Sequence, residues 1–107
     1  MVIELTPEQT QEAVAAHPMI ILSFGAPWCI DCRRAEPFYN KLSESYPQVT
    51  FTKIDISDRE DVRPLFKIQH IPTMIFYKDG VEIDRVVEVP SPSALKTFIE
   101  ECLAKAA

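Results

Sequence analysis

The sequence predicts an α/β domain in which a central mixed β-sheet carries helices on both faces. Short apolar runs alternate with segments of helical periodicity, in the order β-α-β-α-β-α-β-β-α. Helices between strands predict parallel neighbours joined by right-handed crossovers. The last two strands are joined by Asp79-Gly80, a strong hairpin signal that adds antiparallel pairing. We expect one domain over residues 1–107.

The first half of the chain predicts a strand, a helix and a buried strand. Val2–Leu5 is a brief strand candidate. Thr6 followed by proline is typical of a helix start, and Gln9 stands at the reach-back position of a capping box. This helix should end near Ala16, before a His-Pro pair. Met19–Phe24 is an almost unbroken apolar run, which indicates a strand covered on both faces.

The second half of the chain also alternates predicted helices with predicted strands. A helix is expected from Cys29 to about Ser45, with Pro37 inside it. The later elements are a strand over Thr50–Ile56, a short helix over Arg59–Phe66 capped by Asp58, strands over Thr73–Tyr77 and Val81–Val87, and a final helix that Ser91 caps and Pro92 opens.

Composition excludes several classes of function. The net charge of −5 and the pI of about 4.9, with no run of Lys or Arg, argue against nucleic-acid binding. The longest apolar stretch, Met19–Leu22, is too short to cross a membrane. The N-terminus lacks a basic region and an apolar signal core, and three cysteines are too few for a disulfide-stapled secreted fold. We therefore expect a cytoplasmic protein.

Cys29 and Cys32 form a C-x-x-C pair between a buried strand and a helix start. Backbone N–H groups at a helix N-terminus favour a thiolate, so the placement favours a redox pair. A structural metal site would need a second ligand pair, and only Cys102, His17 and His70 remain, none in ligand spacing. Two inert core cysteines are the other alternative. The first cysteine of such a turn should be the more exposed, which makes Cys29 the expected nucleophile and Cys32 the resolving thiol.

The sequence resembles the thioredoxin family. The motif WCIDC at Trp28–Cys32, the IPT at Ile71–Thr73 and the KDG at Lys78–Gly80 carry the resemblance, which covers essentially the whole chain. It implies the thioredoxin fold and disulfide chemistry. It also implies a cis peptide bond at Pro72, which would lie against the sulfurs, and pairing of the Ile71 backbone with an incoming polypeptide.

Reduction of protein disulfides through Cys29 and Cys32 is therefore the expected activity. Thiol–disulfide exchange needs no metal or organic cofactor, because the cysteine pair itself is the redox centre. The resemblance implies disulfide-containing proteins as substrates and a thioredoxin-reductase-type flavoprotein that resets the pair. Two alternatives stay open: a variant biased toward oxidation or isomerisation, and a thioredoxin-fold binding module whose cysteines are idle.

Several residues depart from the family pattern near the cysteines. Asp31 stands between them, where a carboxylate disfavours a neighbouring thiolate, so we expect a reducing pair. Ser23 occupies the place of an aspartate that the family buries behind the resolving cysteine, and Asp31 is a candidate substitute. Lys53 matches a buried family lysine, and Asp55 is its expected partner. Asp31 and Lys53 are thus candidates for tuning the pKa of the cysteine pair.

Other departures concern the docking surface and the core. Trp28 is expected on the surface as a partner contact, and Gly25 replaces a family tryptophan. Glu88 replaces a family glycine, which together with His70 should alter substrate choice. Cys102 lies on the apolar stripe of the last helix and is expected to be buried and unreactive.

Overall fold

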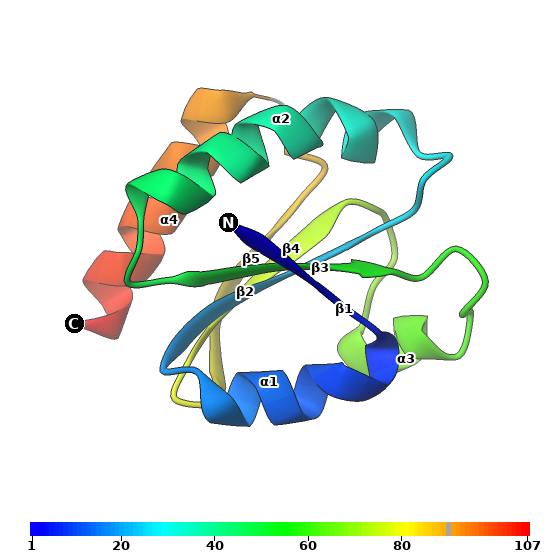
Figure 1. The fold of residues 1–107 in the computed structure, drawn as a ribbon, viewed down its shortest axis with the longest axis horizontal. Helices are drawn as coiled ribbons and strands as arrows, with labels where there is room; N and C mark the ends of the chain where they lie inside the picture. Colours follow the sequence, from blue (N-terminus) through cyan, green and yellow to red (C-terminus); the bar gives the residue numbers. More distant parts are fainter. Residues whose placement is uncertain (90) are drawn as a thin grey trace.

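The computed structural model describes residues 1–89 and 91–107 and has the predicted order of elements (Figure 1). The elements are β1 (Val2–Leu5), a 3-10 turn (Pro7–Gln9), α1 (Thr10–Ala16), β2 (Met19–Gly25), α2 (Ile30–Ser45), β3 (Thr50–Asp55), α3 (Val62–Phe66), β4 (Thr73–Lys78), β5 (Val81–Val87) and α4 (Pro92–Ala106). No helix in the described part of the chain is long and apolar enough to cross a membrane.

Figure 1 shows the sheet nearly edge-on between two layers of helices, with α2 and α4 on one side and α1 and α3 on the other. Each layer has its own core. Under α2 and α4 the buried side chains include Phe51, Phe76 and Ile99. Under α1 and α3 they include Leu22 and Phe24. The predicted α/β architecture with helices on both faces is confirmed.

The five strands lie in the order β1-β3-β2-β4-β5. β1 and β2 pair with β3 in parallel, whereas β4 is antiparallel to both β2 and β5. The expectation that the helix before β4 joins parallel strands was therefore wrong. With five residues, α3 is only about 8 Å long, whereas a parallel crossover must return along a strand of about 20 Å. β4 instead starts at the same end of the sheet at which β3 finishes, and it therefore runs in the opposite direction.

The short helix α3 is also shorter than predicted, since it starts at Val62 and not at Arg59. The residues before it form turns that use the polar side chains locally. The backbone N–H of Ser57 donates to Asp55, and the Arg59 guanidinium binds the carboxylate of Asp61. Arg59 also pairs with Glu8, so it ties this segment to the turn before α1. Asp61, and not Asp58, is the residue at the helix start.

The hairpin between β4 and β5 forms as predicted. Asp79 and Gly80 have φ angles of 51° and 83°, the left-handed backbone that a tight two-residue hairpin turn requires. The capping contact expected before α1 also forms, because the backbone N–H of Thr6 donates to Oε1 of Gln9 at 2.9 Å. These local signals depend on few residues, which is why they are readable from sequence.

Candidate active site

The cysteine pair lies where the central strand β2 ends and α2 begins (Figure 1). Cys29 is the N-cap residue of α2, and its sulfur accepts the backbone N–H of Cys32 at 3.2 Å. A serine or aspartate usually makes this contact with oxygen, and here a sulfur takes that place. The first turn of the helix thus directs an N–H donor and its positive end at Cys29 Sγ.

The loop before β4 packs against the same sulfur. Cys29 Sγ lies 3.7 Å from the carbonyl oxygen of Ile71, with the thiol as donor. The Ile71–Pro72 peptide bond is cis, as the family resemblance implied. Chain segments 42 residues apart in sequence therefore meet at Cys29.

The prediction that Cys29 is the more exposed cysteine was wrong for the residue as a whole. Cys29 is 8 % exposed, whereas Cys32 is half-buried. The loop carrying Ile71 covers Cys29 from outside the motif, which local sequence cannot reveal. Even so, Cys29 lines a surface groove together with Trp28 and Ile71, which we call the outer groove. Cys32 lines a separate cavity, which we call the inner cavity.

The two thiols differ in their electrostatics. Burial raises the pKa of the Cys32 thiol to about 12, and the hydrogen bond with Cys29 and the charge of Asp31 shift it in the same direction. Cys32 is therefore protonated at neutral pH. A protonated Cys32 thiol can donate a hydrogen bond to Cys29 Sγ.

The inner cavity lies behind Cys32 and has a volume of about 330 Å³. Its wall includes Ser23 from the central strand, in the place where the family resemblance implied an aspartate. Gly25 also lines it, and a Cβ at that position would lie 3.0 Å from Cys32 Sγ. Gly25 therefore leaves space for the Cys32 sulfur, a role that the sequence did not indicate.

Lys53 lines the same cavity but does not pair with Asp55 as predicted. Its Nζ lies 3.1 Å from Oε1 of Glu4 and 3.7 Å from Oε1 of Glu36. Glu4 is the direct neighbour of Lys53 in the parallel β1–β3 register, and Asp55 is exposed. The hydrogen bond with Glu4 raises the pKa of Lys53, and the Glu36 carboxylate adds to this, so Lys53 is charged at neutral pH.

Asp31 lies on the outer side of the motif. Its carboxylate is 3.8 Å from the guanidinium of Arg34, one turn along α2, and it borders the outer groove with Trp28 and Ile30. It is not among the residues that line the cavity behind Cys32. The hypothesis that Asp31 replaces a buried carboxylate behind the resolving cysteine is therefore not supported by its position.

The outer groove brings together the predicted docking residues. It is lined by Trp28, Cys29, Ile30, Asp31, Arg63, Gln69, His70, Ile71 and Glu88. Trp28 and Ile30 are each 64 % exposed, as expected for the tryptophan. His70 Nδ1 lies 3.6 Å from Oε1 of Glu88, so the two departures from the family pattern form one polar contact at the rim.

Glu88 adopts a left-handed backbone with φ of 54°, which glycine favours and a glutamate rarely adopts. Its N–H donates to the carbonyl oxygen of Pro72 at 2.8 Å, which fixes the segment after β5 against the loop before β4. Arg63, Gln69 and Ile30 are groove residues that the sequence did not single out, because no local motif marks them. Among the described residues, no cluster of three or more His, Cys, Asp or Glu has the geometry of a metal site.

Cys102 is buried on α4, as predicted. Burial raises its pKa to about 12. Because the folded pKa lies above the ordinary value of 9.0, this thiol adds stability that is fully present below pH 9 and is lost as pH rises through 12.

We therefore expect the free energy of unfolding of the reduced protein to fall between pH 9 and pH 12, the window that Cys32 and Cys102 define. Urea unfolding at pH 7 and pH 10 measures the fall. Replacing Cys102 with Ala should reduce the pH dependence, although it also removes packing. An equal fall in wild type and Cys102→Ala would contradict the assignment.

Similarity to known proteins agrees with this geometry. A family model described as Thioredoxin matches residues 1–101. This chain belongs to the thioredoxin family. It is 33% identical to Thioredoxin-1 of Saccharomyces cerevisiae over 94 residues, which cover 88% of this chain and 90% of the yeast protein. It is 34% identical to Thioredoxin H5 of Arabidopsis thaliana over 103 residues, covering 96% and 83% of the two chains.

The fold also matches solved structures. The oxidised thioredoxin from Plasmodium falciparum superposes with a TM-score of 0.83 at 29% identity, over 94% of this chain and 97% of the other. As a member of the thioredoxin family with both cysteines of the motif, the protein is a thiol–disulfide oxidoreductase and a disulfide reductase.

Proposed function

We propose that Cys29 is the nucleophile that attacks substrate disulfides and that Cys32 resolves the mixed disulfide. The observation that carries this assignment is the 3.2 Å hydrogen bond from the Cys32 backbone N–H to Cys29 Sγ at the start of α2. That bond stabilises negative charge on Cys29, whereas burial keeps Cys32 protonated until it is needed.

The reaction balances without an additional redox group. The Cys29 thiolate attacks one sulfur of the substrate disulfide, and the other substrate sulfur leaves as a thiolate. Cys32 then loses its proton and attacks Cys29 Sγ, so the Cys29–Cys32 bond forms as the bond to substrate breaks. The substrate disulfide is reduced by two electrons, and the cysteine pair is oxidised. We propose no metal or organic cofactor, since thiol exchange supplies all of these steps.

The outer groove is the proposed substrate site. Exposed Trp28 and Ile30 offer apolar contact on one side of Cys29. The backbone of Ile71 offers hydrogen-bonding groups for an extended polypeptide, in the manner of strand addition, with Pro72 beside it. His70 and Glu88 at the rim make the groove polar and selective for substrates that complement this pair.

We further propose a reducing role inside the cell. The Asp31 carboxylate raises the pKa of Cys32 and so disfavours its thiolate. The cysteine pair should therefore be more reducing than strong oxidases, whose potential is about −120 mV. A thioredoxin-reductase-type flavoprotein would then reset the disulfide. The low cysteine count of the chain favours a reducing compartment, and we propose the cytoplasm.

An insulin-reduction assay with dithiothreitol as donor tests the proposal. The reduced protein should accelerate the precipitation of insulin chains at least about tenfold over dithiothreitol alone, because a helix-activated thiolate reacts faster than a free thiol. Turnover no faster than dithiothreitol alone would favour a binding module with idle cysteines. Formation of disulfides in a reduced substrate, faster than their reduction, would indicate an oxidase.

A further inference from the structure

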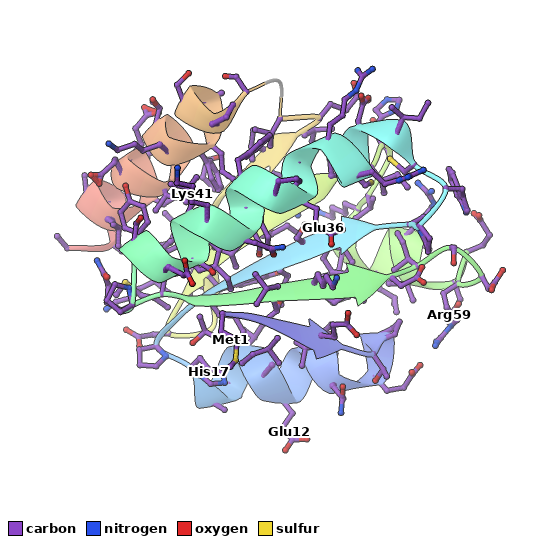
Figure 2. The ribbon with its side chains drawn as sticks, turned by 45° about the horizontal axis from the view of Figure 1, so that its top comes forward. Met1, Glu12, His17, Glu36, Lys41 and Arg59 are labelled. Atoms are coloured by element: carbon purple, nitrogen blue, oxygen red, sulfur yellow. The ribbon has the colours of Figure 1, made fainter. Side chains whose placement is uncertain are left out.

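The cavity behind Cys32 contains a carboxylate that the motif does not predict. Glu36 lies four residues after Cys32 on α2, so both side chains lie on the same face of the helix. Both line the 330 Å³ cavity together with Ser23 and Lys53. Figure 2 shows Glu36 pointing from α2 toward the sheet.

Resolution of the mixed disulfide needs a group near Cys32 that accepts the proton of its thiol. Cys32 must become a thiolate before it attacks Cys29, and burial holds its proton tightly. Ser23 cannot take the proton at neutral pH, because a hydroxyl is far too weak a base. Asp31 borders the outer groove instead of the cavity.

Glu36 meets the requirements for this step. Its side chain is 52 % exposed, so solvent reaches the carboxylate, and the cavity is large enough for bridging water. Lys53 Nζ lies 3.7 Å from Oε1 of Glu36 and orients the carboxylate. Lys53 is in turn held by Glu4 on β1 at 3.1 Å.

We infer that Glu36 accepts the Cys32 thiol proton through water during resolution, with Lys53 positioning it. The thiol proton passes to the Glu36 carboxylate, and the Cys32 sulfur attacks Cys29 Sγ. The Cys29–Cys32 bond forms, the bond from Cys29 to substrate breaks, and the leaving substrate thiolate takes a proton from the Glu36 carboxyl through solvent. This inference rests on the proposed roles of Cys29 and Cys32.

Several titratable or charged groups line the cavity and contribute to its pH profile. They are Glu4 from β1, Lys53 and Asp55 from β3, and Cys32, Arg33, Glu36 and Tyr39 from α2. Of these groups, Glu36 is the carboxylate that lies one helical turn from Cys32 on α2. Asp55 is already engaged by the backbone N–H of Ser57, and Glu4 reaches the cavity from the far side of Lys53.

Two-phase release of thionitrobenzoate from an equimolar aromatic disulfide (Ellman's reagent) isolates the step. The first phase is attack by Cys29, and the second is resolution by Cys32. Glu36→Gln should leave the first phase within about twofold and slow the second at least about tenfold at pH 7. The difference in second-phase rate between wild type and Glu36→Gln should narrow toward pH 10, because hydroxide and buffer then accept the proton in place of the carboxylate. Glu36→Asp should recover most of the lost rate.

The direction in which the second-phase rate changes in Glu36→Gln distinguishes proton transfer from a purely electrostatic effect of the Glu36 charge on Cys32. If Glu36 acted only through its charge, its removal would favour the Cys32 thiolate and speed the second phase. Glu44→Gln, the same change at an exposed position of α2, is the matched control and should leave both phases unchanged.

A second phase in Glu36→Gln that is equal to or faster than wild type would overturn the inference. The proposed cysteine roles fail separately, if Cys29→Ser still shows a first phase at the wild-type rate. The two failures are therefore distinguishable in the same assay.

Discussion

Replacing Cys29 with Ser should abolish insulin reduction, with a loss of at least about a thousandfold in rate. A serine hydroxyl keeps its proton at neutral pH, so the N–H groups of the first turn of α2 have no thiolate to stabilise. Cys32 cannot take over, because burial raises its pKa to about 12 and it lines the inner cavity and not the outer groove.

Cys102→Ala is the control for this experiment. Cys102 is buried on α4, so the variant should keep turnover within about twofold at a temperature where it is folded. Retention of more than a tenth of the wild-type rate in Cys29→Ser would show that another thiol attacks substrate.

Replacing Phe76 with Ala should cost about 3–5 kcal/mol in the free energy of unfolding. Phe76 lies on β4, is fully buried, and packs in the core that α2 and α4 cover, beside Ile21 and Ile99. Since small domains have about 5–15 kcal/mol of stability in total, the melting temperature should fall by more than about 10 °C.

Val81→Ala is the matched control, because Val81 lies on the neighbouring strand with 63 % of its surface exposed. Urea unfolding of both variants should show a loss below about 0.5 kcal/mol for Val81→Ala. A loss under 1 kcal/mol for Phe76→Ala would mean that the described core is wrong.

The local features of this fold were readable from sequence because few neighbouring residues determine them. The apolar run before Gly25, the helix start at the cysteine pair and the Asp79-Gly80 turn each depend on adjacent residues, and each is present in the structure. The family resemblance also predicted a long-range feature, the contact between the cysteine motif and the Ile71–Pro72 loop.

Long-range pairing was not readable in the same way. The partner of Lys53 is Glu4 because β1 and β3 are neighbours in the sheet, and no local pattern specifies that order. The antiparallel course of β4 depends on how far the segment containing α3 travels. The burial of Cys29 depends on a loop 42 residues away.

The position of Glu36 at the cavity behind Cys32 could not be read from the motif for a related reason. Asp31 is nearer to the sulfurs in sequence, but the helix turns it outward toward Arg34. Glu36, one full turn after Cys32, faces the cavity with Lys53. Helical periodicity alone could have suggested Glu36, had the direction of the cavity been known.

The central claim is that Cys29 forms the bond to substrate and Cys32 releases it. Mass spectrometry of the Cys32→Ser variant, mixed with a disulfide-containing protein, tests this claim most directly. The account predicts one stable covalent adduct per chain, joined through Cys29 and absent from Cys29→Ser. An adduct joined through Cys102, or no adduct in Cys32→Ser while the wild type turns over, would contradict it.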